Sequence, residues 1–334
     1  MMPDEIELRS LVEEEAAGLS QRELQGAYAE LSDRYRNGLG TSGMEARHVY
    51  AYMVARLPAT FSSVEASLRA LREQRPRWAP SSLLDLGSGT GSGSWAAVSV
   101  FPSIKSITLV ERELPMIEVG RRLASKSSRS PLRDAVWAQA DAIHPPQGEW
   151  DLVIASYLLT EVPLGGAARA VLEWWTACSG ELVLVDAGTP SGFEGIRKAR
   201  HELIQAGATI TAPCPHDGTC PMSGGNWCHF AVRLERTSTH RRIKGAVVGF
   251  EDEKYSYVIA SRQPPSQTLG RVLRHPQIRS GHVRLELCEP HGLGTEIVTR
   301  RDRDKYKLAR RVRWGDSWNR DADSERGGQT WMAP

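Results

Sequence analysis

Four of the five cysteines are spaced so that they could hold a metal. Cys214, Cys220 and Cys228 fall within one short stretch, and Cys288 follows after a long gap. Thiolates are soft ligands, and four of them together suit zinc or an iron–sulfur cluster. The first three lie among prolines and glycines, in a loop that can wrap around a bulky ligand. We therefore predict a metal-binding insert over residues 211–229, with its fourth ligand supplied from far along the chain.

The cysteine spacing does not decide which metal is bound. Zinc ribbons usually carry pairs of cysteines two residues apart, and this segment has no such pair. His216 and His229 lie beside the cysteines, so a zinc site with mixed cysteine and histidine ligands stays open. The fifth cysteine, Cys178, follows an apolar helical pattern and is most simply a buried thiol of the core.

A glycine-rich turn suggests a second ligand site. The sequence Asp85-Leu-Gly87-Ser-Gly89-Thr-Gly91 follows a short apolar strand and opens a helix. Glycines permit a tight turn and let backbone N–H groups approach a ligand near the start of the helix. Asp85, at the end of the strand, is suited to holding an amino-acid moiety.

Two further acids follow the next predicted strands. Glu111 ends the second strand, where a carboxylate can accept hydrogen bonds from two ribose hydroxyls, and Asp141 ends the third, where it could meet an adenine edge. Dinucleotide sites space their glycines as G-x-G-x-x-G, whereas the spacings here are single. The pattern favours S-adenosylmethionine over a dinucleotide, and a vestigial, empty pocket is the remaining alternative.

Strands and helices alternate around these motifs. Apolar strands are predicted at 83–87, 107–111, 136–141, 151–156, 181–186, 230–236 and 255–262. Alternation with helices predicts parallel pairing, and therefore an α/β fold with a seven-strand Rossmann-like methyltransferase sheet.

We divide the chain into three parts. Residues 1–78 form a helical N-terminal region, interpreted as a cap over the next domain or, alternatively, as a substrate-recognition arm. Residues 79–262 form the methyltransferase-like domain, which includes the cysteine-rich insert. Residues 263–334 form a small basic β domain that supplies Cys288.

Composition limits the partners and the setting. The net charge is only +2 over 334 residues, so any nucleic-acid surface must be local. Five cysteines in a chain of this length do not suggest a disulfide scaffold, and the acidic N-terminus resembles neither a secretory nor a transit signal. No apolar stretch approaches the roughly 20 residues of a membrane span. These features predict a soluble, cytoplasmic, bacterial protein.

One segment has the charge of an RNA-binding surface. Residues 300–313 carry eight basic side chains against Asp302 and Asp304, and Tyr306, Trp314 and Trp318 offer faces on which unpaired bases could stack. A solvated basic helix is the alternative interpretation. A second basic stretch, THRRIKG at residues 239–245, could extend the same surface.

Long motifs in this chain resemble a known family. The segments APCPHDGTCP (212–221), NWCHFAVRLERTSTHRRIKG (226–245), EDEKYSYVIASR (251–262) and DAGTPSGF (186–193) resemble the methyltransferase-like family of small-ribosomal-subunit assembly factors, which has mitochondrial and bacterial members. The resemblance is collinear from about residue 50 to residue 318.

The resemblance implies a fold, two cofactors and a partner. It implies an S-adenosylmethionine-binding sheet of seven strands and a [4Fe-4S] cluster on Cys214, Cys220, Cys228 and Cys288. It also implies binding to small-subunit rRNA or to the pre-ribosomal small subunit. We predict in addition that the chain is monomeric when free.

The sequence does not identify catalytic residues. Methylases of base amino groups often carry an Asn/Asp-Pro-Pro-aromatic turn after the fourth strand, and the sequence here runs Ser156-Tyr-Leu-Leu-Thr-Glu161 instead. Glu161 could act as a base, but a carboxylate near a helix start is more often a solvated cap. Two functions therefore stay open: an rRNA methyltransferase, and a non-catalytic ribosome assembly factor with a zinc rather than an iron–sulfur site.

Overall fold

The computed structural model describes residues 3–36, 43–163, 165–264 and 270–319, and the statements below concern those residues. The end of the predicted β domain, residues 320–334, lies outside them. In the part of the chain that is described, every helix is too short or too polar to cross a membrane.

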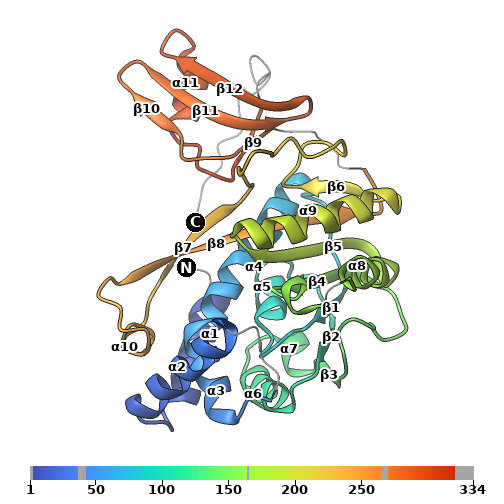
Figure 1. The fold of residues 1–334 in the computed structure, drawn as a ribbon, viewed down its shortest axis with the longest axis vertical. Coiled ribbons are helices and arrows are strands. Elements are labelled where there is room, and N and C mark those ends of the chain that lie inside the picture. Colours follow the sequence, from blue (N-terminus) through green and yellow to red (C-terminus); the bar gives the residue numbers. More distant parts are fainter. Residues whose placement is uncertain (1–2, 37–42, 164, 265–269, 320–334) are drawn as a thin grey trace.

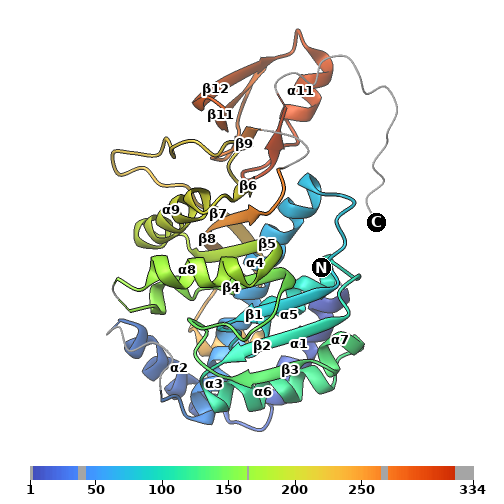
Figure 2. The same cartoon turned by 90° about the vertical axis from the view of Figure 1, so that its right-hand side faces the viewer.

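A mixed sheet of eight described strands forms the centre of the molecule (Figures 1 and 2). The strands are β1 (Ser82–Leu86), β2 (Ser106–Glu111), β3 (Val136–Gln139), β4 (Trp150–Ser156), β5 (Cys178–Ala187), β6 (Thr209–Ala212), β7 (Phe230–Glu235) and β8 (Phe250–Ser261). Their order is β3-β2-β1-β4-β5-β8-β6, and β7 also pairs with β8. Strands β1 to β5 are parallel, whereas β8 runs antiparallel to β5, β6 and β7. This is an α/β fold around a mixed central sheet.

The predicted count of seven strands is wrong, because the sequence pattern missed β6. This strand has only four residues and runs directly into Pro213, so its sequence looks like the start of the cysteine loop. Its pairing partners lie on β8, about fifty residues later, and no local pattern announces them. Strands β6 and β7 occupy the two ends of β8, and the cysteine segment connects them.

Helices cover both faces of the sheet. The helices are α1 (Pro3–Ala16), α2 (Gln21–Arg36), α3 (Ala46–Ala55), α4 (Leu57–Gln74), α5 (Ser92–Val100), α6 (Leu114–Ser125), α7 (Ser130–Arg133), α8 (Ala167–Thr176), α9 (Pro190–Gln205), α10 (Ser238–Ile243) and α11 (Arg303–Ala309), with a 3₁₀ turn η1 at Leu159–Glu161. Successive strand residues point to opposite faces. Leu83 and Ile154 therefore pack with α4 and α5 in one core cluster, and Leu84 and Val153 pack with α8 and α9 in the other.

The N-terminal helices share their hydrophobic core with the sheet. Leu8 of α1 and Phe61 of α4 belong to the same buried cluster as Leu83 of β1 and Trp95 of α5. The hairpin between β7 and β8 extends to these helices, where Gln25 Nε2 donates to the Arg242 carbonyl at 2.9 Å (Figure 1). The N-terminal region is thus part of the body of the molecule.

A second, antiparallel sheet lies beyond the end of β8 (Figure 1). It contains β9 (Gly270–Val272), β10 (Gln277–Arg279), β11 (His282–Glu289), β12 (Gly292–Thr299) and β13 (Ser317–Trp318). Strand β11 pairs with β9, β10 and β12, and β13 pairs with β9. Helix α11 packs on one face of this sheet through buried Ala309, and Leu285 and Trp318 belong to the same small core.

Candidate functional site

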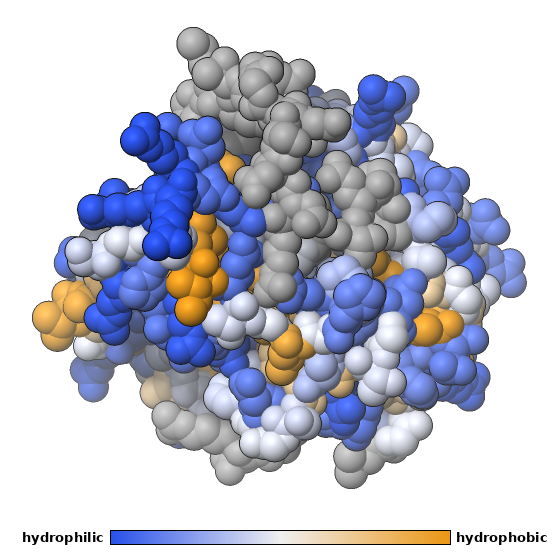
Figure 3. All heavy atoms as spheres, turned by 90° about the horizontal axis from the view of Figure 1, so that it is seen from above, coloured by the Kyte–Doolittle hydropathy of each residue, from blue (hydrophilic) through white to orange (hydrophobic). Residues whose placement is uncertain are grey.

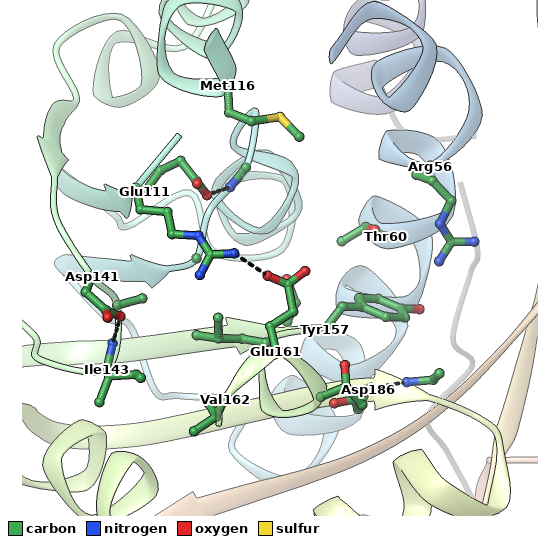
Figure 4. A pocket seen from close by; sticks show the side chains of 18 of the residues that line it. Arg56, Thr60, Glu111, Met116, Asp141, Ile143, Tyr157, Glu161, Val162 and Asp186 are labelled. Carbon is green, nitrogen blue, oxygen red and sulfur yellow. Dashed lines mark hydrogen bonds and ion pairs between the residues drawn. The ribbon is translucent and has the colours of Figure 1, made fainter. Parts of the chain in front are cut away.

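A cavity of about 550 Å³ lies at the carboxyl ends of the parallel strands (Figure 4). Its lining includes residues at or just after the ends of β1, β2, β3, β4 and β5, together with residues from α3 and α4. In open α/β sheets, ligands bind in the crevice outside these strand ends, where neighbouring connections run to opposite faces. The volume is in the range of small-molecule sites.

The glycine turn forms one wall of the cavity. Gly87 and Gly89 line it with φ angles of +60° and +56°, which side-chain-bearing residues rarely adopt. A Cβ atom on Gly87 would lie 2.8 Å from Leu158 Cδ1, so the turn approaches the segment after β4 closely. Gly91, with φ +92°, caps the start of α5 and does not line the cavity.

Glu111 lines the cavity and also holds the glycine turn. One carboxylate oxygen accepts a hydrogen bond from Gly89 N at 2.8 Å, and the other accepts from Glu113 N at 2.9 Å. Burial raises the pKa of this carboxyl group. Asp141 also lines the cavity but is exposed, and it accepts from Ile143 N at 2.9 Å (Figure 4).

Asp85 lies beneath the first turn of α5 and does not line the cavity. It is fully buried, and its Oδ2 accepts from both the backbone N and the hydroxyl of Ser94 at 2.8 Å. Burial raises the pKa of Asp85 to about 7. The structure therefore gives Asp85 a role in fastening α5 to β1, and its predicted contact with an amino-acid moiety would have to be indirect.

Helices α3 and α4 contribute cavity residues that the sequence did not reveal. Arg56 and Thr60 line the cavity on the side opposite Glu111 (Figure 4), and Tyr52 is also part of the lining. Arg56 Nη2 forms an ion pair with Glu253 of β8 at 3.1 Å. In the sequence, this region showed only the apolar periodicity of helices, which did not indicate that its side chains would line a cavity.

Tyr157 was also missed as a cavity residue. Its φ of +57° is unusual for a side chain of this size, and such conformations cluster at functional sites. The Tyr157 hydroxyl donates to Glu253 at 2.8 Å and lies 3.1 Å from the Ser63 hydroxyl. The only signal in the sequence was its place directly after the fourth predicted strand.

The four predicted cysteine ligands line one small cavity of about 30 Å³. Cys214, Cys220 and Cys228 come from the segment between β6 and β7, and Cys288 comes from β11. Burial raises the pKa of Cys288 to about 12, and neighbouring thiolates contribute in the same direction. Apolar side chains, including those of Phe193, Met222 and Leu273, form the rest of the lining.

The thiols nevertheless do not have the arrangement of a single-ion site. Among the described residues, no group of three or more His, Cys, Asp or Glu side chains is positioned to hold a metal ion. His216 Nε2 lies 3.9 Å from Cys288 Sγ, whereas His229 stacks on Trp227 with ring centroids 4.9 Å apart. Of the two histidines considered as ligands, His216 therefore contacts a predicted cysteine ligand, whereas the ring of His229 is stacked on Trp227.

Two buried arginines lie beside the cysteine cavity. Arg200 is 5% exposed and donates to the His216 carbonyl at 2.6 Å. Arg271 is 2% exposed and donates to the carbonyls of Pro213 and Gly315 at 3.2 and 2.8 Å. Neither guanidinium forms an ion pair with an acid in the described part of the chain, although buried charges are usually paired.

The basic segment after β12 forms an open groove along α11. Its lining consists of Arg300, Arg303, Tyr306, Lys307, Arg310 and Arg311, around a volume of about 690 Å³. The predicted stacking role of Trp318 is wrong, because this side chain is 6% exposed and donates to Glu296 at 2.7 Å. Trp314 packs edge-on against His229 and His275, so Tyr306 is the aromatic residue that lines the groove.

The second basic stretch is largely occupied by internal contacts. Lys244 Nζ and His240 Nε2 lie 2.8 and 3.3 Å from carboxylate oxygens of Glu251. Within this stretch, Arg241 and Arg242 are the exposed basic residues.

The face of the molecule seen from above is mainly hydrophilic, with a few separate apolar side chains (Figure 3).

Comparisons with solved structures give low similarity. Magnesium protoporphyrin IX methyltransferase from Synechocystis PCC 6803 is 14% identical, with 69% of this chain and 90% of that chain covered and a TM-score of 0.40. A putative RNA methyltransferase from Pyrococcus horikoshii is also 14% identical, with 59% and 83% covered and a TM-score of 0.39.

Comparisons of sequence are more informative. The human mitochondrial ribosome assembly protein METTL17 is 30% identical over 286 residues, which cover 79% of this chain and 61% of that protein. The mitochondrial Rsm22-cox11 tandem protein 2 of Schizosaccharomyces pombe is 28% identical over 340 residues, or 83% of this chain and 44% of that protein. The chain thus spans about half the length of these relatives. Both are mitochondrial proteins, and the bacterial cytoplasmic setting stays a prediction.

The family assignment follows from the extent of a further match. Residues 46–319 match the family described as mitochondrial small ribosomal subunit Rsm22. This range contains the cavity, the four cysteines and the basic groove. The chain therefore belongs to the Rsm22 family.

Proposed function

We propose that this protein is an S-adenosylmethionine-binding, iron–sulfur-containing, methyltransferase-like factor that binds small-subunit rRNA during ribosome assembly. The observation that carries the proposal is the basic groove along α11 in a chain of the Rsm22 family. The name of the human relative, a ribosome assembly protein, supports the same partner for this chain.

The groove has the charge needed to bind a phosphate backbone. Arg300, Arg303, Arg310 and Arg311 are exposed, and none forms an ion pair with another described residue. Unpaired arginines can neutralise phosphates and release counterions, which gives affinity without sequence preference. Tyr306 is the one aromatic residue in the groove lining. We therefore propose that the groove binds the RNA backbone and does not stack a run of unpaired bases.

The cavity at the strand ends supports the proposed S-adenosylmethionine site. The Gly87–Gly89 turn brings backbone close to the ligand, Glu111 would receive the ribose, and Asp141 would lie near the base. Gly91 and Asp85 would support the turn from outside the cavity. When bound, the ligand supplies an activated methyl group, and a role as a structural ligand is equally compatible with this cavity.

We expect Gly89→Val to abolish S-adenosylmethionine binding. A β-branched residue at φ +56° is strained, and its Cβ atom would lie 3.7 Å from the hydroxyl of Tyr52, another residue of the cavity lining. Gly207→Val is the matched control, because Gly207 has φ +84° and lies outside the cavity lining, and a Cβ atom there would meet nothing within 4 Å. Calorimetry should show that binding is abolished only in Gly89→Val. Equal affinities in both variants and the wild type would rule out this site.

The cysteine cavity supports a metal centre on Cys214, Cys220, Cys228 and Cys288. An all-thiolate centre carries net negative charge, which the unpaired guanidiniums of Arg200 and Arg271 would offset. We propose a [4Fe-4S] cluster, in which each thiolate would bind a different iron, and zinc is the alternative. Analysis of protein purified without oxygen distinguishes them, since the cluster requires iron and sulfide in equal amounts.

Binding to the small subunit tests the proposed function as a whole. The full chain should bind small-subunit rRNA, with an affinity that falls steeply as salt rises. A single-turnover assay with labelled S-adenosylmethionine and the same RNA then separates the two candidate roles. Transfer of label identifies a methyltransferase, and stable RNA binding by Gly89→Val without transfer identifies an assembly factor. A chain that binds no small-subunit RNA at low salt contradicts both.

A further inference from the structure

The cavity has two sides with different charge environments. Gly87, Gly89 and Glu111 belong to the side formed by β1 and β2, and Tyr157 and Asp186 belong to the side formed by β4 and β5 (Figure 4). If Glu111 receives the ribose, as proposed above, the methionine end of the ligand extends across β1 toward β4 and β5. The sulfonium and its methyl group would then face the second side.

Asp186, at the end of β5, is a buried carboxylate with an unused acceptor. It is 1% exposed, and its Oδ1 accepts from Ala187 N at 2.7 Å. Its Oδ2 has no partner with hydrogen-bond geometry among the described residues, although the backbone N–H of Thr160 is near enough to act toward a lower pKa, and the side chain forms no ion pair there. Burying an ionised carboxylate without a counter-charge is unfavourable, and burial accordingly raises the pKa of Asp186 to about 6.

The other charged groups of the cavity are already compensated. Arg56 is paired with Glu253 at 3.1 Å. Arg112 is paired with Glu161 at 3.4 Å, and both residues line the cavity. Glu111 accepts from two backbone N–H groups. Glu111 and Asp186 are therefore the buried carboxylates of this cavity that form no ion pair among the described residues, and of the two only Asp186 has an oxygen without a hydrogen bond there.

We infer that Asp186 makes the cavity selective for a ligand that is positively charged on the β4–β5 side. The inference rests on the proposed binding of S-adenosylmethionine. It assigns the cavity a preference for the sulfonium of S-adenosylmethionine over the neutral thioether of S-adenosylhomocysteine. By the same reasoning, an ammonium group placed at the sulfonium position is bound more tightly than the thioether.

Calorimetry with three ligands tests this inference without requiring methyl transfer. The ligands are S-adenosylmethionine, S-adenosylhomocysteine, and sinefungin, in which an amine-bearing carbon replaces the sulfonium. In the wild type, both cationic ligands should bind more tightly than S-adenosylhomocysteine. In Asp186→Asn, the ratio of the affinity for each cationic ligand to the affinity for S-adenosylhomocysteine should fall by about tenfold. A change of this size is expected when the interaction between two charges several ångströms apart is removed at the effective dielectric of a protein site. The carbonyl of asparagine keeps an acceptor for Ala187 N.

Glu161→Gln is the matched control, because it removes the same charge from the same cavity. The charge of Glu161 is already offset by Arg112, so the ratio of cation to thioether affinity should change less than about twofold. S-adenosylhomocysteine affinity in each variant reports whether the cavity is still formed. An unchanged ratio in Asp186→Asn overturns the inference, as does an equal fall of the ratio in Glu161→Gln.

Two other outcomes are also decisive. An Asp186→Asn variant that binds none of the three ligands assigns Asp186 a structural role and overturns charge selectivity. A wild type that binds none of them overturns the proposed ligand together with the inference. A wild type that binds all three with equal affinity overturns the inference alone.

Discussion

We expect Cys288→Ser to remove the metal from the protein and to loosen the C-terminal sheet. Cys288 is the one predicted ligand in that sheet, while Cys214, Cys220 and Cys228 precede β7 of the central sheet. A metal held from both sides couples the folding of the two parts. Removal of one thiolate should therefore release most of the bound iron and make residues 270–319 more sensitive to limited proteolysis.

Cys178→Ser provides the matched control for this substitution. Cys178 is 1% exposed in β5, outside the cysteine cavity, and burial raises the pKa of its thiol to about 12. Its replacement should lower stability slightly and leave iron and sulfide content unchanged. If Cys288→Ser keeps its metal, Cys288 is not a ligand. If the metal is released and the protease sensitivity stays the same, other contacts hold the C-terminal sheet.

Such contacts are present between the C-terminal sheet and the rest of the molecule. Arg271 of β9 donates to the Pro213 carbonyl, and Arg274 Nη2 donates to the Trp227 carbonyl at 3.3 Å. Gln74 Nε2 of α4 also donates to the Ser317 hydroxyl at 3.3 Å. We therefore expect the sheet of the variant to become more mobile relative to the body without unfolding completely.

The central strands could be predicted because buried parallel strands are continuous apolar runs bounded by turns. The prediction for β4, at 151–156, differs from the observed strand by one residue. Strand β6 has no such run, and its existence depends on pairing with β8. The smaller strands β10 and β13 were missed for a related reason, since two or three residues carry no detectable period.

The residues of the candidate site also fall into those that the sequence could predict and those that depend on the tertiary fold. Gly87, Gly89 and Glu111 could be predicted to lie together, because a turn and the end of the neighbouring strand are adjacent in every fold of this class. Arg56 reaches the cavity only through the packing of α4 against the sheet, which depends on the tertiary fold. Asp85 was predicted from the same motif as Gly87 but faces the helix, because Ser94 supplies both of its hydrogen-bond donors.

We expect the double variant Arg310→Glu/Arg311→Glu to weaken small-subunit rRNA binding strongly. Both side chains line the groove, are exposed and form no ion pair among the described residues. Removing one phosphate contact should reduce the slope of log affinity against log salt by roughly 0.7 to 0.9. Removing two of them and adding two negative charges should lower affinity by about tenfold or more at moderate salt. Titration of labelled rRNA at several salt concentrations measures both quantities.

The double variant Arg241→Glu/Arg242→Glu is the matched control and also tests the second basic stretch. It changes the net charge by the same amount at two exposed arginines of α10, far from the groove along the chain. If RNA binds only in the groove along α11, Arg241→Glu/Arg242→Glu should keep the wild-type slope of log affinity against log salt. Its affinity for rRNA should then be lowered only slightly, because the protein as a whole carries less positive charge. An equal reduction of affinity in both variants would mean that net charge, and not the groove, determines binding.

A further pair of substitutions separates RNA contact from damage to α11. Arg310 is the C-cap of this helix, and a negative charge at a helix C-terminus is unfavourable by roughly 0.3–1 kcal/mol. Arg310→Gln/Arg311→Gln removes the positive charges without adding that repulsion, so it should reduce the salt slope by nearly as much while leaving the thermal unfolding unchanged. S-adenosylmethionine affinity should also stay the same, because the groove and the cavity share no lining residue. If the glutamine variant binds rRNA with the wild-type slope, these arginines do not contact phosphates and RNA binding must be assigned to another surface.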